Sequence, residues 1–187
     1  VGLGSSQAFI GSLLNAAKLP LKDVEMIRSS HSLVTPFLAG QLDAMTGIYR
    51  NVEPFLMHDK GTELKLFYYE EHGVPPFDEL IIVANAQFAS SPKIRLFVDA
   101  LEEAAQYLIN HRHDCLESFK KDYPEQKNNV LAKIWEETMP RFALRPGMLD
   151  HHRYARFAHY LKEANLIQET PDVSTYATDV QGIPSPN

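Results

Sequence analysis

The residues best suited to hold a small ligand lie at positions 47–54, GIYRNVEP, where a predicted strand ends and a predicted helix begins. Ligands of open α/β sheets bind beyond the carboxyl ends of strands, which favours Tyr49, Asn51 and Glu53. A tyrosine can stack on a flat ring, and a carboxyl group can hydrogen-bond an aminopyrimidine or similar heterocycle. Tyr49 and Glu53 are four residues apart and can share one face of a helical turn. In the purely structural alternative, Asn51 caps the helix and Glu53 complements its dipole.

A second candidate site is the predicted strand-to-helix turn at positions 2–7, GLGSSQ. Glycines permit a tight turn, and the hydroxyls of Ser5 and Ser6 with the free N–H groups of a helix start suit an anion or a polar ligand atom. An ordinary N-cap is the alternative. The turn lacks the lysine of a nucleotide-binding P-loop and the third glycine of a dinucleotide fingerprint, which disfavours both functions.

Histidine and cysteine offer little chemistry here. His111 and His113, two residues apart, point away from each other on a helix, whereas His111 and the single Cys115, four apart, can face each other. This is too small a ligand set for a metal site, and Cys115 lacks a positioned base. We therefore expect no metal site, no catalytic residue and no cofactor.

Composition narrows the classes of partner. The chain of 187 residues is 44% hydrophobic and carries 24 acidic and 18 basic residues, a net charge of -6. Nucleic acids and anionic membranes need clustered lysine and arginine, so both are disfavoured. The sequence shows no signal peptide and no apolar stretch of membrane-spanning length.

Apolar runs and amphipathic segments alternate in the first part of the chain, which is typical of an α/β lobe with parallel strands. The C-terminal half has helical periodicity. A Pro-stiffened aromatic segment at 68–79 predicts either a hinge or pocket edge or a surface crossover loop. Strands are predicted at 1–3, 23–28, 44–48, 64–69 and 80–84, and helices at 6–18, 32–41, 51–60, 91–120, 127–137 and 150–164.

Four segments together carry a family resemblance: VGLGSSQAF, LAGQLDAMTGIYRNVEPFLMHDKG, HGVPPFDELIIVANAQFA and RFAHYLKEANLI. Their order resembles the thiamine-pyrimidine-precursor family of type II periplasmic binding proteins. That family includes a solute-binding protein for formylaminopyrimidine salvage and the fungal hydroxymethylpyrimidine phosphate synthase. The similarity spans about residues 1–180, and its most specific part combines Leu42-Asp43-Ala44 with the stretch from Gly47 to Glu53.

The resemblance implies an α/β fold of the type II periplasmic-binding-protein kind, with one complete α/β lobe and the mainly helical returning part of the other. Residues 1–70 would form lobe two, 71–90 the crossover or hinge with a returning strand, and 91–187 the helical C-terminal part of lobe one. The first half of lobe one would have no counterpart in this truncated chain. We expect its exposed sheet edges to favour self-association.

At matching positions, the resemblance implies that Tyr49 packs against a pyrimidine and that Glu53 binds its amino group and ring nitrogen. Asn51 belongs to the same ligand-binding stretch, and Gly4, Ser5 and Ser6 would face the ligand's substituent. A proton shared between Glu53 and the ring would satisfy both groups, so affinity should fall at high pH.

The implied function is the non-catalytic solute-binding component of an ABC importer for a thiamine pyrimidine precursor or related small heterocycle. The implied partner is an ABC permease, and the implied location is periplasmic or membrane-anchored extracytoplasmic. One alternative is a hydroxymethylpyrimidine phosphate synthase-like enzyme of thiamine biosynthesis, whose cysteine-rich iron motif is absent from a chain with only Cys115. Another is a binding protein for a sulfonate or aromatic acid, for which Arg50 is the plausible partner.

Overall fold

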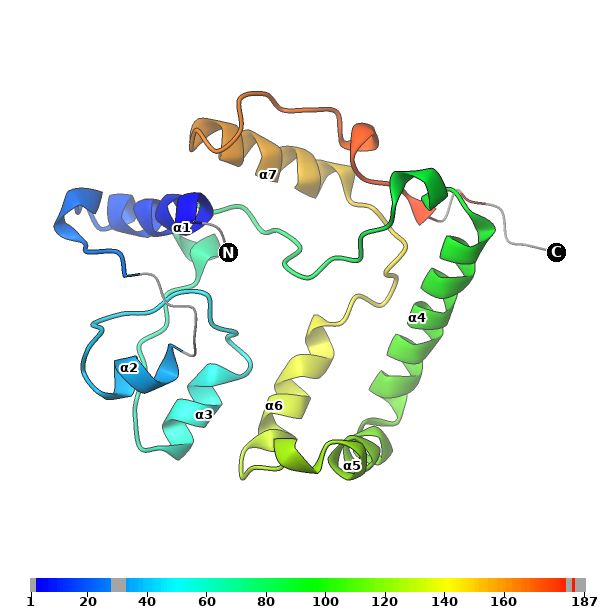
Figure 1. Cartoon of the computed structure of the whole chain (residues 1–187), viewed down its shortest axis with the longest axis horizontal. Helices are drawn as coiled ribbons and strands as arrows, with labels where there is room; N and C mark the ends of the chain where they lie inside the picture. Colours follow the sequence, from blue (N-terminus) through cyan, green and yellow to red (C-terminus); the bar gives the residue numbers. More distant parts are fainter. Residues whose placement is uncertain (1–2, 28–32, 181–182, 184–187) are drawn as a thin grey trace. The chain divides into compact units, whose positions relative to one another are not determined.

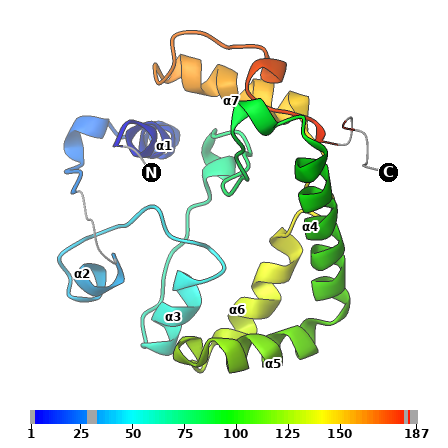
Figure 2. The same cartoon turned by 45° about the vertical axis from the view of Figure 1, so that its right-hand side comes forward.

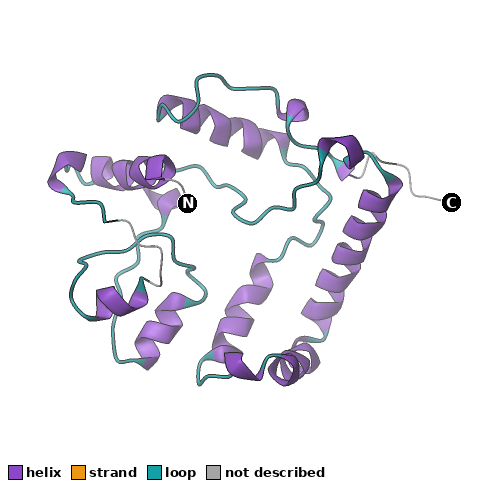
Figure 3. Cartoon of the chain, in the orientation of Figure 1, coloured by secondary structure: helices purple, strands orange, loops and turns teal. Residues whose placement is uncertain are grey.

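A computed structural model describes residues 3–27, 33–180 and 183 of the chain. These residues contain seven α-helices. Loops and short 3-10 turns join them (Figures 1 and 3). The α-helices are α1 (Leu3–Ala16), α2 (Val34–Leu38), α3 (Glu53–Asp59), α4 (Pro92–Asn110), α5 (Arg112–Asp122), α6 (Leu131–Thr138) and α7 (His151–Glu163). The 3-10 turns are η1 (Leu21–Asp23), η2 (Tyr69–His72), η3 (Ala86–Phe88), η4 (Pro124–Gln126), η5 (Met139–Arg141) and η6 (Val173–Thr175).

Every predicted helix has a counterpart, although the boundaries shift by a few residues. Helix α4 begins as the Ser-Pro signal predicts: Ser91 is the N-cap, its Oγ accepts from the backbone N–H of Lys93 at 3.3 Å, and Pro92 starts the helix. The single helix predicted over 91–120 is wrong in one respect. The backbone at His111 leaves the helical region (φ -123°, ψ 40°), and this residue separates α4 from α5.

The predicted strands do not occur in the part of the chain that the structure describes, and Figure 3 draws loops, turns or helix in their place. Leu3, predicted to end the first strand, begins α1, while residues 1–2 and 28 of the predicted strands lie outside the described residues. A strand exists only when a neighbour accepts and donates its ladder of hydrogen bonds. The helical C-terminal half is confirmed, and the α/β lobe is not.

The chain divides into two compact units, and the first combines residues 1–77 with residues 152–171. Its core is aromatic. Phe9 of α1 is 7% exposed, and its ring lies 5.1 Å from that of Tyr69 and 5.5 Å from that of Phe77. On α7, Phe157 stacks on Phe77 at 4.6 Å, and the Tyr160 hydroxyl lies 3.0 Å from that of Ser12. These contacts pack α1 against α7, helices from opposite ends of the sequence (Figures 1 and 2).

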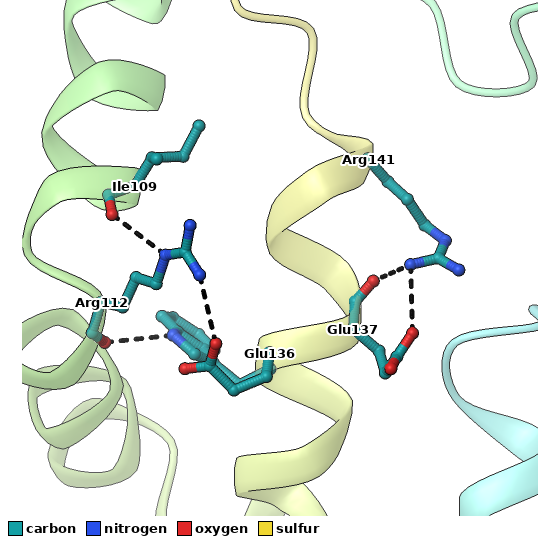
Figure 4. A network of polar contacts seen from close by, with 6 residues as sticks. Ile109, Arg112, Glu136, Glu137 and Arg141 are labelled. Carbon is teal, nitrogen blue, oxygen red and sulfur yellow. Dashed lines mark hydrogen bonds and ion pairs between the residues drawn. The ribbon is translucent and has the colours of Figure 1, made fainter.

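The second unit combines residues 78–151 with residues 172–187. Arg112, at the start of α5, connects three elements (Figure 4). Its Nε donates to the carbonyl of Ile109 at 3.1 Å, and its guanidinium lies 3.3 Å from the Glu136 carboxylate of α6. Its own carbonyl accepts from the indole N–H of Trp135 at 3.1 Å. Arg112 therefore fastens α6 to the junction between α4 and α5.

The predicted lobe boundaries, 1–70, 71–90 and 91–187, stay predictions, because compact units and ligand-binding lobes are different divisions of a chain. Among the described helices, none combines the length and the apolar character that a membrane crossing requires.

Candidate ligand site at the start of helix α3

The turn before α3 holds Tyr49 and Glu53 close together. The carbonyl of Tyr49 accepts from the backbone N–H groups of Val52 at 3.0 Å and Glu53 at 3.2 Å, which closes the turn. Glu53 Oε2 in return accepts from the backbone N–H of Tyr49 at 2.7 Å. The carboxylate is thus fixed beside the Tyr49 backbone, while 43% of Tyr49 remains exposed. One aromatic ring and one carboxylate are presented within a single turn.

The structural alternative assigned Asn51 as the helix cap and Glu53 as the residue that complements the helix dipole. The structure agrees with this position for Glu53 but not for Asn51. Val52, not Asn51, holds the N-cap position of α3, and it makes no side-chain capping bond. Glu53 is the acidic residue of the first helical turn, where a carboxylate complements the helix dipole. Asn51 lies half-buried between Tyr49 and Glu53 in sequence. A carboxylate has about four lone-pair positions, so its bond to Tyr49 leaves Glu53 capacity to accept from a ligand amino group.

Arg50 follows Tyr49 in this turn, and its side chain contacts residues outside the turn. Its guanidinium donates to both carboxylate oxygens of Glu70, at 2.7 Å and 2.9 Å, and lies 4.3 Å from the centre of the Tyr68 ring. The hydrogen bonds to Glu70 raise the pKa of Arg50, and those from Arg50 hold the pKa of Glu70 below its usual value. This bidentate pair attaches the Tyr49–Glu53 turn to residues 68–70.

The segment Tyr68–His72 also supports helix α1. Tyr69 packs its ring on Phe9, and its hydroxyl hydrogen-bonds the Thr46 hydroxyl. The turn around Tyr49 and the helix that carries Ser6 therefore rest on one short segment. Sequence reasoning predicted this Tyr-Tyr-Glu-Glu-His run to be part of either a hinge or pocket edge or a surface crossover loop, but did not assign Glu70 or Tyr68 to the Tyr49 turn. Opposite charges twenty residues apart give no periodic signal that could have revealed the pair.

The predicted glycine-serine turn is a helix in the structure. Leu3 begins α1, which puts Gly4, Ser5 and Ser6 in its first turns. Gly2 lies outside the described residues. Ser6 is half-buried, and no described hydrogen bond joins it to Tyr49 or Glu53. The first N–H groups of a helix lack intrahelical partners, and donation from this stretch to a polar ligand atom stays a prediction.

A cavity of about 450 Å³ lies elsewhere in the same unit, between α7 and the loop after η2. Its wall combines imidazoles, a guanidinium and a phenol, and the His159 imidazole is 3.1 Å from the Glu163 carboxylate. The lining residues are Gly73, Pro75, His152, Ala155, Arg156, His159, Tyr160 and Glu163. This wall does not include Tyr49, Asn51 or Glu53, so the predicted residues and the cavity are separate features.

The histidines and the cysteine form no metal-binding cluster within the described ranges, where no three His, Cys, Asp or Glu side chains come together as a metal requires. Cys115 is a free, half-buried thiol on α5.

Comparison with known proteins identifies relatives. A family model described as NMT1/THI5 like matches residues 1–114. A "Putative thiamine biosynthesis protein" of Haemophilus influenzae is 32% identical over 179 residues, which cover 95% of this chain and 57% of the relative. A "Formylaminopyrimidine-binding protein" of Halalkalibacterium halodurans is 22% identical over 141 residues, which cover 74% of this chain and 42% of the relative.

The chain thus spans about half the length of the curated relatives that it matches. No solved structure matches it. The family match covers more than half of the chain and includes the whole of the Tyr49–Glu53 turn and its supporting segment. The resemblance inferred from sequence is confirmed: the chain belongs to the NMT1/THI5-like family.

Proposed function

We propose that this chain is part of the solute-binding component of an ABC importer, and that it binds a thiamine pyrimidine precursor or a related small heterocycle without transforming it. The observation that carries the proposal is the turn before α3, where Tyr49 offers a half-exposed ring and Glu53 a carboxylate fixed by a 2.7 Å bond. A flat ring with an amino group beside a ring nitrogen matches both groups. A relative named for binding formylaminopyrimidine supports this ligand class.

The state of Arg50 favours a neutral heterocycle over a sulfonate or an aromatic acid. An anionic ligand needs a cation with hydrogen bonds to give, and Arg50 already donates to both oxygens of Glu70. Displacing Glu70 would leave its carboxylate without the partner that lowers its pKa. Arg50 therefore acts as a structural tie in this proposal, and Tyr49 and Glu53 contact the ligand.

The proposed location is extracytoplasmic, either periplasmic or membrane-anchored, and the proposed partner is an ABC permease. Both follow from the function of a solute-binding component. The lobe arrangement belongs to the same proposal: an α/β clamp of the type II periplasmic-binding-protein kind, in which this chain supplies one wall of the ligand site.

Ligand-observed NMR tests the proposal, because it detects the weak binding expected of one wall. Formylaminopyrimidine is titrated into the wild-type chain, Glu53→Gln, Glu53→Ala and Tyr49→Ala. A hydrogen bond to a charged group is worth about 1.5–3 kcal/mol, so both Glu53 variants should bind roughly 10- to 150-fold more weakly. The control is Glu63→Gln, because this side chain is 90% exposed and pairs only loosely with His58 at 3.6 Å. Unchanged binding in both Glu53 variants would refute the assignment.

A synthase-like enzyme is the second candidate, favoured by the relative named as a putative thiamine biosynthesis protein. Incubating the chain with a small-molecule extract of cells, without added pyrimidine, and measuring pyrimidines by mass spectrometry separates the two. A synthase would raise the total amount of a pyrimidine above that in the extract alone, whereas a binding protein would leave the total unchanged.

A further inference from the structure

The cavity of about 450 Å³ beside α7 is a feature of the first unit that the proposed function does not use. One wall is a single face of α7, whose residues stand at positions 152, 155, 156, 159, 160 and 163. The other wall is formed by Gly73 and Pro75, which are uncharged. The charged groups that line the cavity therefore all come from α7. Helix α1, which packs against α7, adds none, since no residue from Leu3 to Ala16 is charged.

Both walls are held in place by contacts outside the cavity. Val74, between Gly73 and Pro75, is only 2% exposed, and its backbone N–H donates to the carbonyl of Tyr69 at 3.2 Å. On the α7 side, the ring of Phe157 stacks on that of Phe77 at 4.6 Å. A cavity with walls fixed in this way needs little rearrangement when a ligand binds.

Arg156 makes one end of the cavity a donor of hydrogen bonds. No hydrogen bond or ion pair among the described residues occupies its guanidinium. His152, one helical turn before it, adds an imidazole to the same end. A guanidinium presents paired N–H groups whose geometry matches a carboxylate. This end is therefore suited to the carboxylate of a ligand.

Glu163 and Tyr160 make the other end an acceptor. Oε1 of Glu163 lies 3.1 Å from Nε2 of His159, and a carboxylate with about four lone-pair positions can still accept from a ligand. The Ser12 hydroxyl donates to the carbonyl of Ala8 at 3.2 Å, so the 3.0 Å bond between the Ser12 and Tyr160 hydroxyls uses the hydrogen of Tyr160. The Tyr160 oxygen can then only accept. This end is suited to an ammonium group.

The spacing of the two ends sets the size of the ligand. Arg156 and Glu163 are seven residues apart, which is about 10 Å along a helix. A hydrogen bond of about 2.8 Å at each end leaves roughly 5 Å between the two charges of the ligand. An amino acid with three carbons between its amino and carboxyl groups spans about this distance when extended. Ala155 and Pro75 in the lining offer apolar surface to these carbons.

We propose that this cavity binds a small zwitterion, an amino acid with about three carbons between its amino and carboxyl groups. The carboxylate contacts Arg156, and the ammonium group contacts Glu163 and Tyr160. A simple anion or a simple amine would engage only one end and leave the other without a partner. The site is separate from the Tyr49–Glu53 turn and does not rest on the function proposed for that turn.

Ligand-observed NMR on the 187-residue chain at low salt tests the proposal with three probes of equal length: 4-aminobutanoate, butanoate and butylamine. Glu163 is 67% exposed, so its ion pair with a ligand is partly screened and binding is weak. We expect 4-aminobutanoate to bind about 5-fold or more tightly than either probe with a single charge. Glycine, whose charges lie closer together, should bind more weakly than 4-aminobutanoate.

Substitutions locate the site. Arg156→Gln and Glu163→Gln should each weaken the binding of 4-aminobutanoate about 5-fold or more. Lys162→Gln, on the same helix but outside the cavity wall, and Glu169→Gln, at an exposed position after the helix, are the matched controls and should leave binding unchanged.

Equal binding of butanoate would overturn the proposal in favour of an anion site, and equal binding of butylamine in favour of a cation site. Glycine that binds as tightly as 4-aminobutanoate would overturn the spacing argument and with it the proposed ligand class. Absence of binding by 4-aminobutanoate, or binding that neither Arg156→Gln nor Glu163→Gln weakens, would overturn the site itself.

Discussion

The ion pair between Arg50 and Glu70 gives the sharpest test of what holds the Tyr49–Glu53 turn in place. Glu70→Gln keeps the size of the side chain and removes its charge, so the guanidinium loses its two charge-assisted bonds at 2.7 Å and 2.9 Å. Arg50→Met removes the other partner and keeps part of the contact with Tyr68. The double variant completes a cycle that isolates the coupling between the two charges.

The expected size of that coupling follows from exposure and geometry. The side chains of Arg50 and Glu70 are 41% and 39% exposed, which places the pair among surface ion pairs worth about 0.2–1 kcal/mol. Bidentate geometry and the position over the Tyr68 ring put it at the upper end of this range. We therefore expect a coupling of about 1 kcal/mol, well below the roughly 3–5 kcal/mol cost of breaking a buried pair.

Urea unfolding of the four proteins, in low salt and in 1 M salt, measures the coupling. The control is a second cycle at Lys120 and Glu117, a pair with one 2.7 Å bond on the surface of α5, where we expect a smaller coupling. The pH dependence of the coupling between Arg50 and Glu70 follows from the lowered pKa of Glu70. The stabilisation is complete above the ordinary carboxyl pKa and is lost as the pH falls through the lowered value. A coupling no larger than the control's, or one that survives acid, would refute this account of the turn.

Two further predictions concern the cores and caps of the units. Phe9→Ala removes the ring at the centre of the aromatic core and should cost about 3–5 kcal/mol in thermal unfolding, whereas Phe67→Ala, at a 56% exposed ring, should cost under about 1 kcal/mol. The pKa of Asp172 is lowered by hydrogen bonds from the Ser174 hydroxyl and backbone N–H, so its stabilisation exists above the ordinary pKa and disappears as the pH falls through the lowered value. The melting temperatures of Asp172→Asn and of the wild type should converge as the pH is lowered. A difference that stays constant with pH would contradict stabilisation by the ionised Asp172 carboxylate.

The sequence predicted the helices well because their determinants are local. The Ser91-Pro92 start and the apolar period after it are readable within a few residues, and so are the limits of α7. The predicted strands do not occur among the described residues, because the determinants of a strand are not local. The run at Leu80–Val83 has strand composition, but a strand is completed by partners elsewhere, and the described chain supplies none. The break at His111 went unpredicted because the apolar period runs on through it.

In the candidate site, too, local features were predicted from the sequence and contacts between distant residues were not. Tyr49 and Glu53 were found because they are four residues apart, and their proximity follows from the local hydrogen bonds that close the turn. Whether they bind a pyrimidine stays a prediction. The Arg50–Glu70 pair could not be predicted, because helix α3 and a loop whose course no local pattern records lie between its two members. The first turn of α1 was predicted as the end of a strand and a tight turn because Gly2 and Gly4 favour turns, although a helix can contain one glycine such as Gly4.

The way α7 completes the first unit sets an order for its assembly. The hydrogen bond between Ser12 and Tyr160 joins residues 148 positions apart, and the aromatic core around Phe9 needs Phe157 as well. During synthesis, α1 must therefore remain without its partner helix until residues 151–163 have left the ribosome. Most of the second unit, residues 78–151, emerges first. Contacts of such long sequence separation fold slowly. The aromatic core around Phe9 therefore stays open to water in the nascent chain until α7 has been made.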